Sequence, residues 1–143
     1  MSISDIIYKH IRQAIKESAT IIAEYARENH RFKAHTGQME RSVVPESISN
    51  TSAVIRLDTA VAPYAAYVHQ GTAAHRIVPR RRMALRWTDG GRFRFSKWVN
   101  HPGTRSDPFL YQAADTNRDK VAGIVDRQIE TAKDDIAAAL TGR

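Results

Sequence analysis

Cysteine is absent from the 143-residue sequence, so the chain can form neither a disulfide framework nor a thiolate metal site. Long apolar runs are absent as well, and no stretch approaches the roughly 18 apolar residues that a membrane-spanning helix needs. The first apolar stretch contains Asp5 and Lys9 and lacks the continuous apolar core of a signal peptide. We therefore expect a protein that contacts no membrane and is made in the cytoplasm.

Acidic side chains are scarce in one segment, and the net charge of +7 is concentrated there. From His75 to Lys97 the chain has eight lysines and arginines against the single acid Asp89, whereas the remainder has 14 side chains of each sign. The arginines of this segment are Arg76, Arg80, Arg81, Arg82, Arg86, Arg92 and Arg94. Such a block indicates an acidic partner, either nucleic acid or an acidic protein face. The alternative is a solvated hairpin that contributes solubility.

Two long amphipathic helices are predicted at the ends of the chain. Over residues 4–29 an apolar stripe recurs every three or four positions, with Ser4 as the cap. This stripe comprises Ile7, Ile11, Ile15, Ala19, Ile22 and Ala26. The helix is long for a domain of this size, so we expect part of the stripe to pack on a neighbouring subunit.

The second long helix is expected to start with Asp107 as cap and Pro108 in its first position. Its stripe comprises Phe109, Ala113, Val121, Val125, Ile129, Ala132, Ile136 and Leu140. A bend is predicted at Asn117 or Gly123. Glycine costs about 1 kcal/mol relative to alanine inside a helix, so Gly123 indicates close packing at that position.

The middle of the chain predicts two antiparallel hairpins separated by a short helix. One hairpin covers residues 42–59 and the other residues 83–98, whose Asp89-Gly90-Gly91 turn is a strong hairpin signal. The short helix lies between Pro63 and Gly71, and residues 100–106 are expected to form an irregular loop. The predicted fold class is α+β: a small antiparallel sheet of two hairpins, flanked by the long helices, in a single domain over residues 1–143.

The second hairpin is expected to have one apolar side and one charged side. Phe93 and Phe95 alternate with Arg92 and Arg94, which predicts that the two phenylalanines face a core. The other interpretation uses the interleaved aromatic residues as platforms for bases. Because no sequence-reading motif is present, any contact with DNA should be independent of its sequence.

Constellations of catalytic residues are lacking. The chain has no His-Glu-x-x-His spacing, no Gly-x-Ser-x-Gly elbow and no phosphate-binding glycine loop. The spacing of His69, His75 and His101 fits no standard ligand pattern, so a metal site or a small hydrolase built on these residues is a minor alternative. We expect no enzyme activity, no cofactor and no bound metal.

Residues 36–42, 64–72 and 101–110, in this order, resemble segments of a family of small tailed-bacteriophage proteins that includes neck and tail-completion proteins. Residues 36–42, Thr-Gly-Gln-Met-Glu-Arg-Ser, resemble the family's Thr-Gly-x-Leu-x-x-Ser. Residues 64–72 are similar to its Tyr-Ala-x-Tyr-Val-Glu-x-Gly-Thr, with His69 in place of the acid, and residues 101–110 to its His-Pro-Gly-Thr-x-x-x-Pro-Phe-Leu. The matching residues are Thr36, Gly37, Ser42, Tyr64, Gly71, Thr72, His101, Pro102, Gly103, Pro108 and Phe109.

The resemblance implies a structural virion protein at the head–tail connection, made in the cytoplasm of a bacterial host. It implies a ring of copies, a hexamer or a dodecamer, around the DNA channel, in contact with head-closure or connector proteins and with tail terminator or tail tube proteins. It implies no catalytic residue and no cofactor. The alternative function is a sequence-independent nucleic-acid-binding module that uses the arginine-rich hairpin. The sequence leaves open whether these arginines face packaged DNA or a neighbouring subunit.

Overall fold

The structure is a computed structural model that describes residues 1–142. Within this range the chain forms five helices and six strands, which confirms the α+β class. The helices are α1 (Ile3–Glu28), α2 (Gln38–Ser42), α3 (Ala65–Gln70), α4 (Phe109–Thr116) and α5 (Arg118–Thr141). The strands are β1 (Val43–Ser49), β2 (Ser52–Leu57), β3 (His75–Ile77), β4 (Leu85–Asp89), β5 (Arg92–Ser96) and β6 (Val99–His101).

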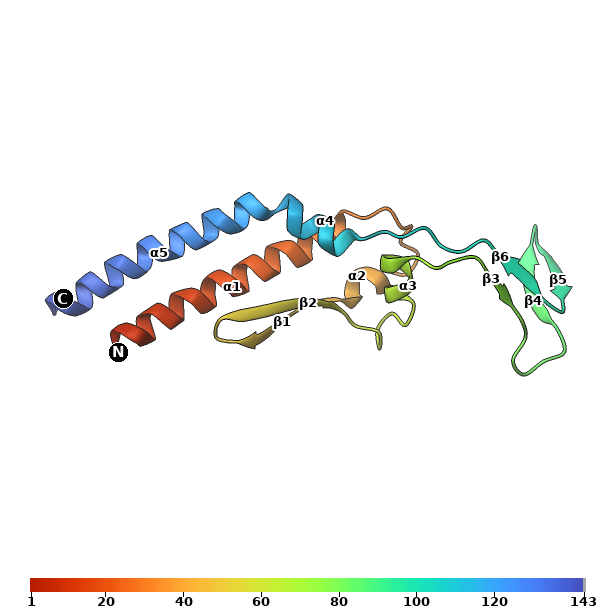
Figure 1. The fold of residues 1–143 in the computed structure, drawn as a ribbon, viewed down its shortest axis with the longest axis horizontal. Coiled ribbons are helices and arrows are strands. Elements are labelled where there is room, and N and C mark those ends of the chain that lie inside the picture. The colour runs from red at the N-terminus through yellow and green to blue at the C-terminus, as the bar shows by residue number, and fades with distance from the viewer. Residues whose placement is uncertain (143) are drawn as a thin grey trace.

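The molecule is elongated, with a helical hairpin at one end and a group of short strands at the other (Figure 1). Helices α1 and α5 run side by side, the β1–β2 hairpin lies along α1, and α2, α3 and α4 occupy the middle. We call residues 1–71 and 107–142 the body, and residues 72–106 the arm. The arm contains β3 to β6 and projects from the middle of the molecule, away from both termini.

The strands pair as separate two-stranded antiparallel sheets, β1–β2, β4–β5 and β3–β6. The first two are the predicted hairpins. The third pairs His75 with His101 and Ile77 with Val99, so the expectation that residues 100–106 form only an irregular loop is wrong. This pairing joins segments more than twenty residues apart, and no local turn signal announces it.

Both long helices form, but the cap and the buried face of α1 differ from the prediction. Ser2, not Ser4, caps α1: its hydroxyl accepts a hydrogen bond from the Asp5 N–H, and the Asp5 carboxylate accepts one from the Ser2 N–H. The buried face of α1 is also rotated from the predicted stripe, since Ile6 is buried whereas Ile7 remains 41% exposed. The full set of buried α1 residues is Ile6, His10, Ala14, Ser18, Ala19, Ala23 and Ala26.

The predicted bend in the second helix lies at Asn117, where α4 ends and α5 begins. Asn117 is buried, and its side-chain amide donates to the Ala113 carbonyl oxygen at 2.8 Å, which satisfies a carbonyl at the end of α4. The prediction that Gly123 packs closely is wrong within residues 1–142, because a Cβ at this position would meet no heavy atom within 4 Å. Much of the predicted stripe on α5 is exposed, including Val125, Ile129 and Leu140.

The core lies where α1, α2, α3 and α4 meet beside β1, and small side chains let these elements approach closely. Phe109 is its largest fully buried side chain, and its ring centroid lies 5.2 Å from that of Phe32 and 5.5 Å from that of His69. The core residues are Ala23, Ala26, Met39, Val43, Ala62, Ala65, Phe109 and Ala113. The position predicted for Phe109 is therefore confirmed.

Asp107 does not cap the last helix as predicted. The N-cap position belongs to Pro108, and no side chain caps that end. The buried Asp107 carboxylate instead accepts hydrogen bonds from the backbone N–H groups of Arg31 and Phe32, at 2.6 and 3.0 Å. Asp107 thus fastens the segment after α1 to the entrance of α4, because its buried carboxylate needs hydrogen-bond donors.

Candidate functional site

The arm is joined to the body at a narrow root. Thr72 and Thr104 exchange backbone hydrogen bonds of 2.9 and 3.1 Å, which clamp the outgoing and returning chains together. Gly71 has φ +78°, and a Cβ there would lie 2.7 Å from the Thr104 carbonyl oxygen. Gly103 has φ +89°, and its Cβ would overlap the Thr72 carbonyl oxygen. Only glycine suits these two positions, since both the backbone conformation and the lack of space exclude a side chain.

The root brings together two of the segments that carry the phage resemblance. Gly71 and Thr72 end the second segment, whereas His101, Pro102, Gly103 and Thr104 begin the third, and the backbone bonds of the root join them. The third segment then returns to the body core through Pro108 and Phe109. These residues hold the arm in place, and their contacts are structural.

The first of these segments lies in the body. Gly37 takes φ +70° at the N-cap of α2, and no side chain caps that end of the helix. The preceding residue, Thr36, is exposed. The buried Ser42 hydroxyl donates to the Met39 carbonyl oxygen at 2.6 Å. Tyr64 of the second segment reaches toward this helix, with its hydroxyl 3.5 Å from Gln38 Oε1. The three segments thus meet around one core.

Arginines and aromatic residues share both faces of the β4–β5 ribbon, so the predicted division into an apolar and a charged side is wrong. The register pairs Arg86 with Phe95 and Trp87 with Arg94, and directly paired residues lie on the same face. Phe93 and Phe95 are 62% and 66% exposed, so they do not face a core. A two-stranded ribbon with no layer packed against it leaves both faces in solvent.

Two arginines of the arm lie over aromatic rings. The Arg76 guanidinium lies 4.4 Å from the Trp98 ring centroid, and that of Arg86 lies 4.7 Å from the Phe93 centroid. These distances are within the range of favourable cation–π interactions. Arg94 forms an exposed ion pair with Asp89 at 3.4 Å.

A basic hollow opens where the β3–β4 loop curves beside the ribbon. It has a volume of about 700 Å³ and is lined by Pro79, Arg80, Arg81, Arg82, Met83, Ala84, Leu85, Arg86 and Phe95. Arg80, Arg81 and Arg82 are exposed and have no acidic partner among residues 1–142. The hollow therefore combines an apolar, aromatic lining with a high density of positive charge.

The histidines considered as a metal or catalytic group do not assemble. His75 and His101 pair across β3 and β6, with ring centroids 5.1 Å apart. His69 instead lies in the body, where its ring forms T-shaped contacts with the rings of Phe109 and Tyr111. Burial lowers the pKa of His69, so that the neutral ring is favoured. Within residues 1–142 no group of three or more His, Cys, Asp or Glu side chains is placed to hold a metal ion.

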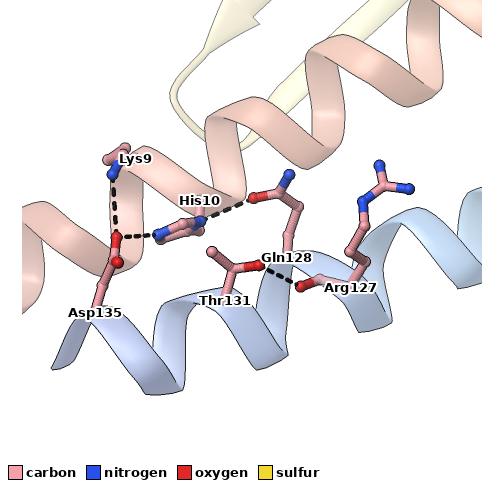
Figure 2. A network of polar contacts seen from close by, with 6 residues as sticks. All are labelled: Lys9, His10, Arg127, Gln128, Thr131 and Asp135. Atoms are coloured by element: carbon pink, nitrogen blue, oxygen red, sulfur yellow. Dashed lines mark hydrogen bonds and ion pairs between the residues drawn. The ribbon is translucent and has the colours of Figure 1, made fainter. Parts of the chain in front are cut away.

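Figure 2 shows a polar network between α1 and α5 that no sequence pattern predicted. The buried His10 ring places Nδ1 2.8 Å from Gln128 Oε1, and its Nε2 donates to Asp135 Oδ2 at 2.9 Å. Lys9 Nζ donates to the same carboxylate oxygen at 3.1 Å. These bonds from His10 and Lys9 lower the pKa of Asp135. The available signal was the four-residue spacing of Ile6, His10 and Ala14, which puts His10 on the buried face.

No protein-family model, curated protein or solved structure matches the chain. No helix in the described part of the chain, residues 1–142, is both long and apolar enough to cross a membrane.

Proposed function

We propose that this chain is a structural subunit of the head–tail connection of a tailed bacteriophage, as a neck or tail-completion protein. Copies form a closed ring around the DNA channel, and the ring contacts head-closure or connector proteins on one side and tail terminator or tail tube proteins on the other. The proposal rests on the resemblance of residues 36–114 to that phage family. It is supported by the way the three matching segments converge on one core and on the root of the arm.

The observation that carries an assembly role is the exposure of apolar side chains at both ends of an elongated chain. At the helical end, Ile7, Tyr8 and Ile129 are exposed. At the other end, the arm exposes Met83, Trp87 and Trp98, and none of the residues 72–106 is buried. Exposed apolar patches on a protein surface mark sites of interaction. A ring subunit covers such surfaces with its neighbours, through heterologous contacts that close by rotation.

The first test measures the mass of the purified chain in solution by light scattering and native mass spectrometry. A closed hexamer or dodecamer is expected. Ile129→Glu places a charge in the exposed stripe of α5 and should reduce the assembly to smaller species. Ala138→Glu is the matched control, because position 138 is exposed and lies about half a turn away from Ile129 around α5, so the substitution should leave the mass unchanged. A strictly monomeric wild-type chain at all concentrations would contradict the ring.

The second test removes the gene from the phage that encodes it. Particles made without this protein should have filled heads and separate or unstable tails, visible by electron microscopy, and complementation should restore joined particles. Normal yields of infectious particles from the deletion would exclude a role in joining heads to tails.

A further inference from the structure

The positive charge of the arm has no counterpart in the chain itself. Within the described residues 1–142, Arg94 is the one arm arginine that has an acidic partner. The chain outside the His75–Lys97 segment carries equal numbers of acidic and basic side chains. A second copy therefore brings no excess negative charge to neutralise the arm. Because like charges held close together repel, this cluster favours a ligand that is itself a polyanion.

The aromatic residues of the arm distinguish between polyanions. Phe93 and Phe95 are exposed, and both lie on the same ribbon face as Arg86. An acidic protein face would pair with the guanidinium groups and leave flat rings without matching partners. Duplex DNA presents phosphates outward and keeps its bases stacked inside. Unpaired nucleotides offer both a phosphate for arginine and a free base for stacking on an aromatic ring.

We propose that the basic hollow beside β4 and β5 binds single-stranded nucleic acid, independently of its sequence. A base stacks on the exposed ring of Phe95, and the neighbouring phosphates pair with Arg80, Arg81 and Arg82 around the opening. Arg86 is paired with Phe95 in the ribbon register, so its charge lies on the same face as the stacking ring. The volume of about 700 Å³ is within the usual range of small-ligand pockets and can take a nucleotide.

The first experiment measures binding of a fluorescent oligo(dT) of about 16 nucleotides to the full chain by anisotropy over a series of salt concentrations. The variant R80Q/R81Q/R82Q should bind at least about tenfold more weakly, and its log–log salt slope should fall by about 2, as expected for three lost phosphate contacts. The control R12Q/K16Q/K120Q removes three exposed charges from α1 and α5 and should stay within about twofold of wild type. Equal losses in both variants would show a nonspecific charge effect and overturn the proposed site.

The second experiment tests stacking. Phe95→Leu keeps an apolar side chain but removes the aromatic face, and should weaken oligo(dT) binding about tenfold. Trp87→Leu on the opposite face should change it less than about twofold. If Phe95→Leu has no effect and a duplex of equal length binds as tightly as oligo(dT), the arm contacts duplex phosphates and the proposal is wrong.

A third experiment, competition with polyglutamate, distinguishes a nucleic acid from an acidic protein partner. Polyglutamate at the same charge concentration should displace oligo(dT) poorly, and equal displacement would indicate an acidic protein partner and overturn the proposal. This inference stands apart from the assembly role, since solution mass and particle joining are measured independently of oligonucleotide binding. A ring that fails to bind oligo(dT) refutes only the nucleic-acid site, whereas a monomer that binds it refutes only the ring.

Discussion

Phe109 in the body has none of its surface exposed, whereas Phe93 and Phe95 in the arm each expose more than half of theirs. The body gathers helices and a hairpin around a shared set of buried side chains. The arm has paired strands and loops and no helix, and residues 72–106 include no buried residue. The same residue type therefore stabilises the body through burial and is available to a partner in the arm. An isolated two-stranded ribbon is marginally stable in water, so we expect the arm to be less stable than the body.

The largest expected effect is the difference in stability between replacing a buried phenylalanine and replacing an exposed one. Phe109→Ala should lower the free energy of unfolding by about 3–5 kcal/mol, because it leaves a cavity in the hydrophobic core cluster, where Phe109 is the largest buried side chain. Phe93→Ala should change it by less than about 0.5 kcal/mol, because that ring is mostly exposed. Urea denaturation followed by circular dichroism measures both. Equal costs would show that the arm contributes to the core of the free subunit.

The next effect concerns the junction between the two regions. Gly103→Ala should cost about 1–3 kcal/mol, since alanine is strained at φ +89° and its Cβ would overlap the facing backbone at Thr72 and Ala73. Amide exchange should then rise in β3 and β6 and remain slow in α4. Gly90→Ala at the ribbon tip is the control, because it shares the positive φ but its Cβ would have no neighbour within 4 Å. If both substitutions open the root equally, the close approach at Gly103 is not what holds it.

A smaller effect of opposite sign is expected in α5. Gly123→Ala should stabilise the protein by up to about 1 kcal/mol, because alanine favours the helix and its Cβ would occupy open space. Thermal denaturation of the monomeric or assembled protein at fixed concentration measures the change. A loss of stability, or a change in assembly mass, would show that a neighbouring copy packs closely against Gly123.

The smallest effect is a pH dependence in the body. The folded-state pKa of Asp135 is lowered from 3.8 by His10 and then Lys9, so its contribution to stability is present above the unfolded value and is lost as pH falls through the folded value. Asp135→Asn should therefore reduce Tm at pH values well above 3.8, and the difference from wild type should vanish in strong acid. The carboxylate is exposed, which keeps the effect small. A difference that grows below pH 3.8 would contradict this sign.

Predictions from the sequence succeeded where the signal is local. The turn between β4 and β5 was predicted from two adjacent glycines, and Gly90 and Gly91 have φ values of +55° and +79° as that hairpin requires. The sequence predicts a bend at Asn117 or Gly123, and only the structure places it at Asn117, between α4 and α5. The arginine-rich segment was recognised from charge alone, but its hollow depends on the loop that curves beside Phe95.

Sequence patterns failed where a side chain's partner lies far away along the chain. Asp107 at a helix start reads as a cap, yet its carboxylate binds the backbone at Arg31 and Phe32. Alternation in β5 predicts a core side and a solvent side, but it cannot show that no second layer packs on the ribbon. Likewise, nothing local links His10 to Asp135 across the helical hairpin.

The sequence by itself therefore determined the α+β class, the two end helices, the hairpins and the position of the positive charge, because periodicity, turn residues and charge act over a few residues. Only the tertiary structure decided that the arm is separate from the core, that Gly71 and Gly103 form its root, and that aromatic residues join arginines on both ribbon faces. These features depend on contacts between segments that are far apart in the sequence, because those contacts determine side-chain burial and strand register.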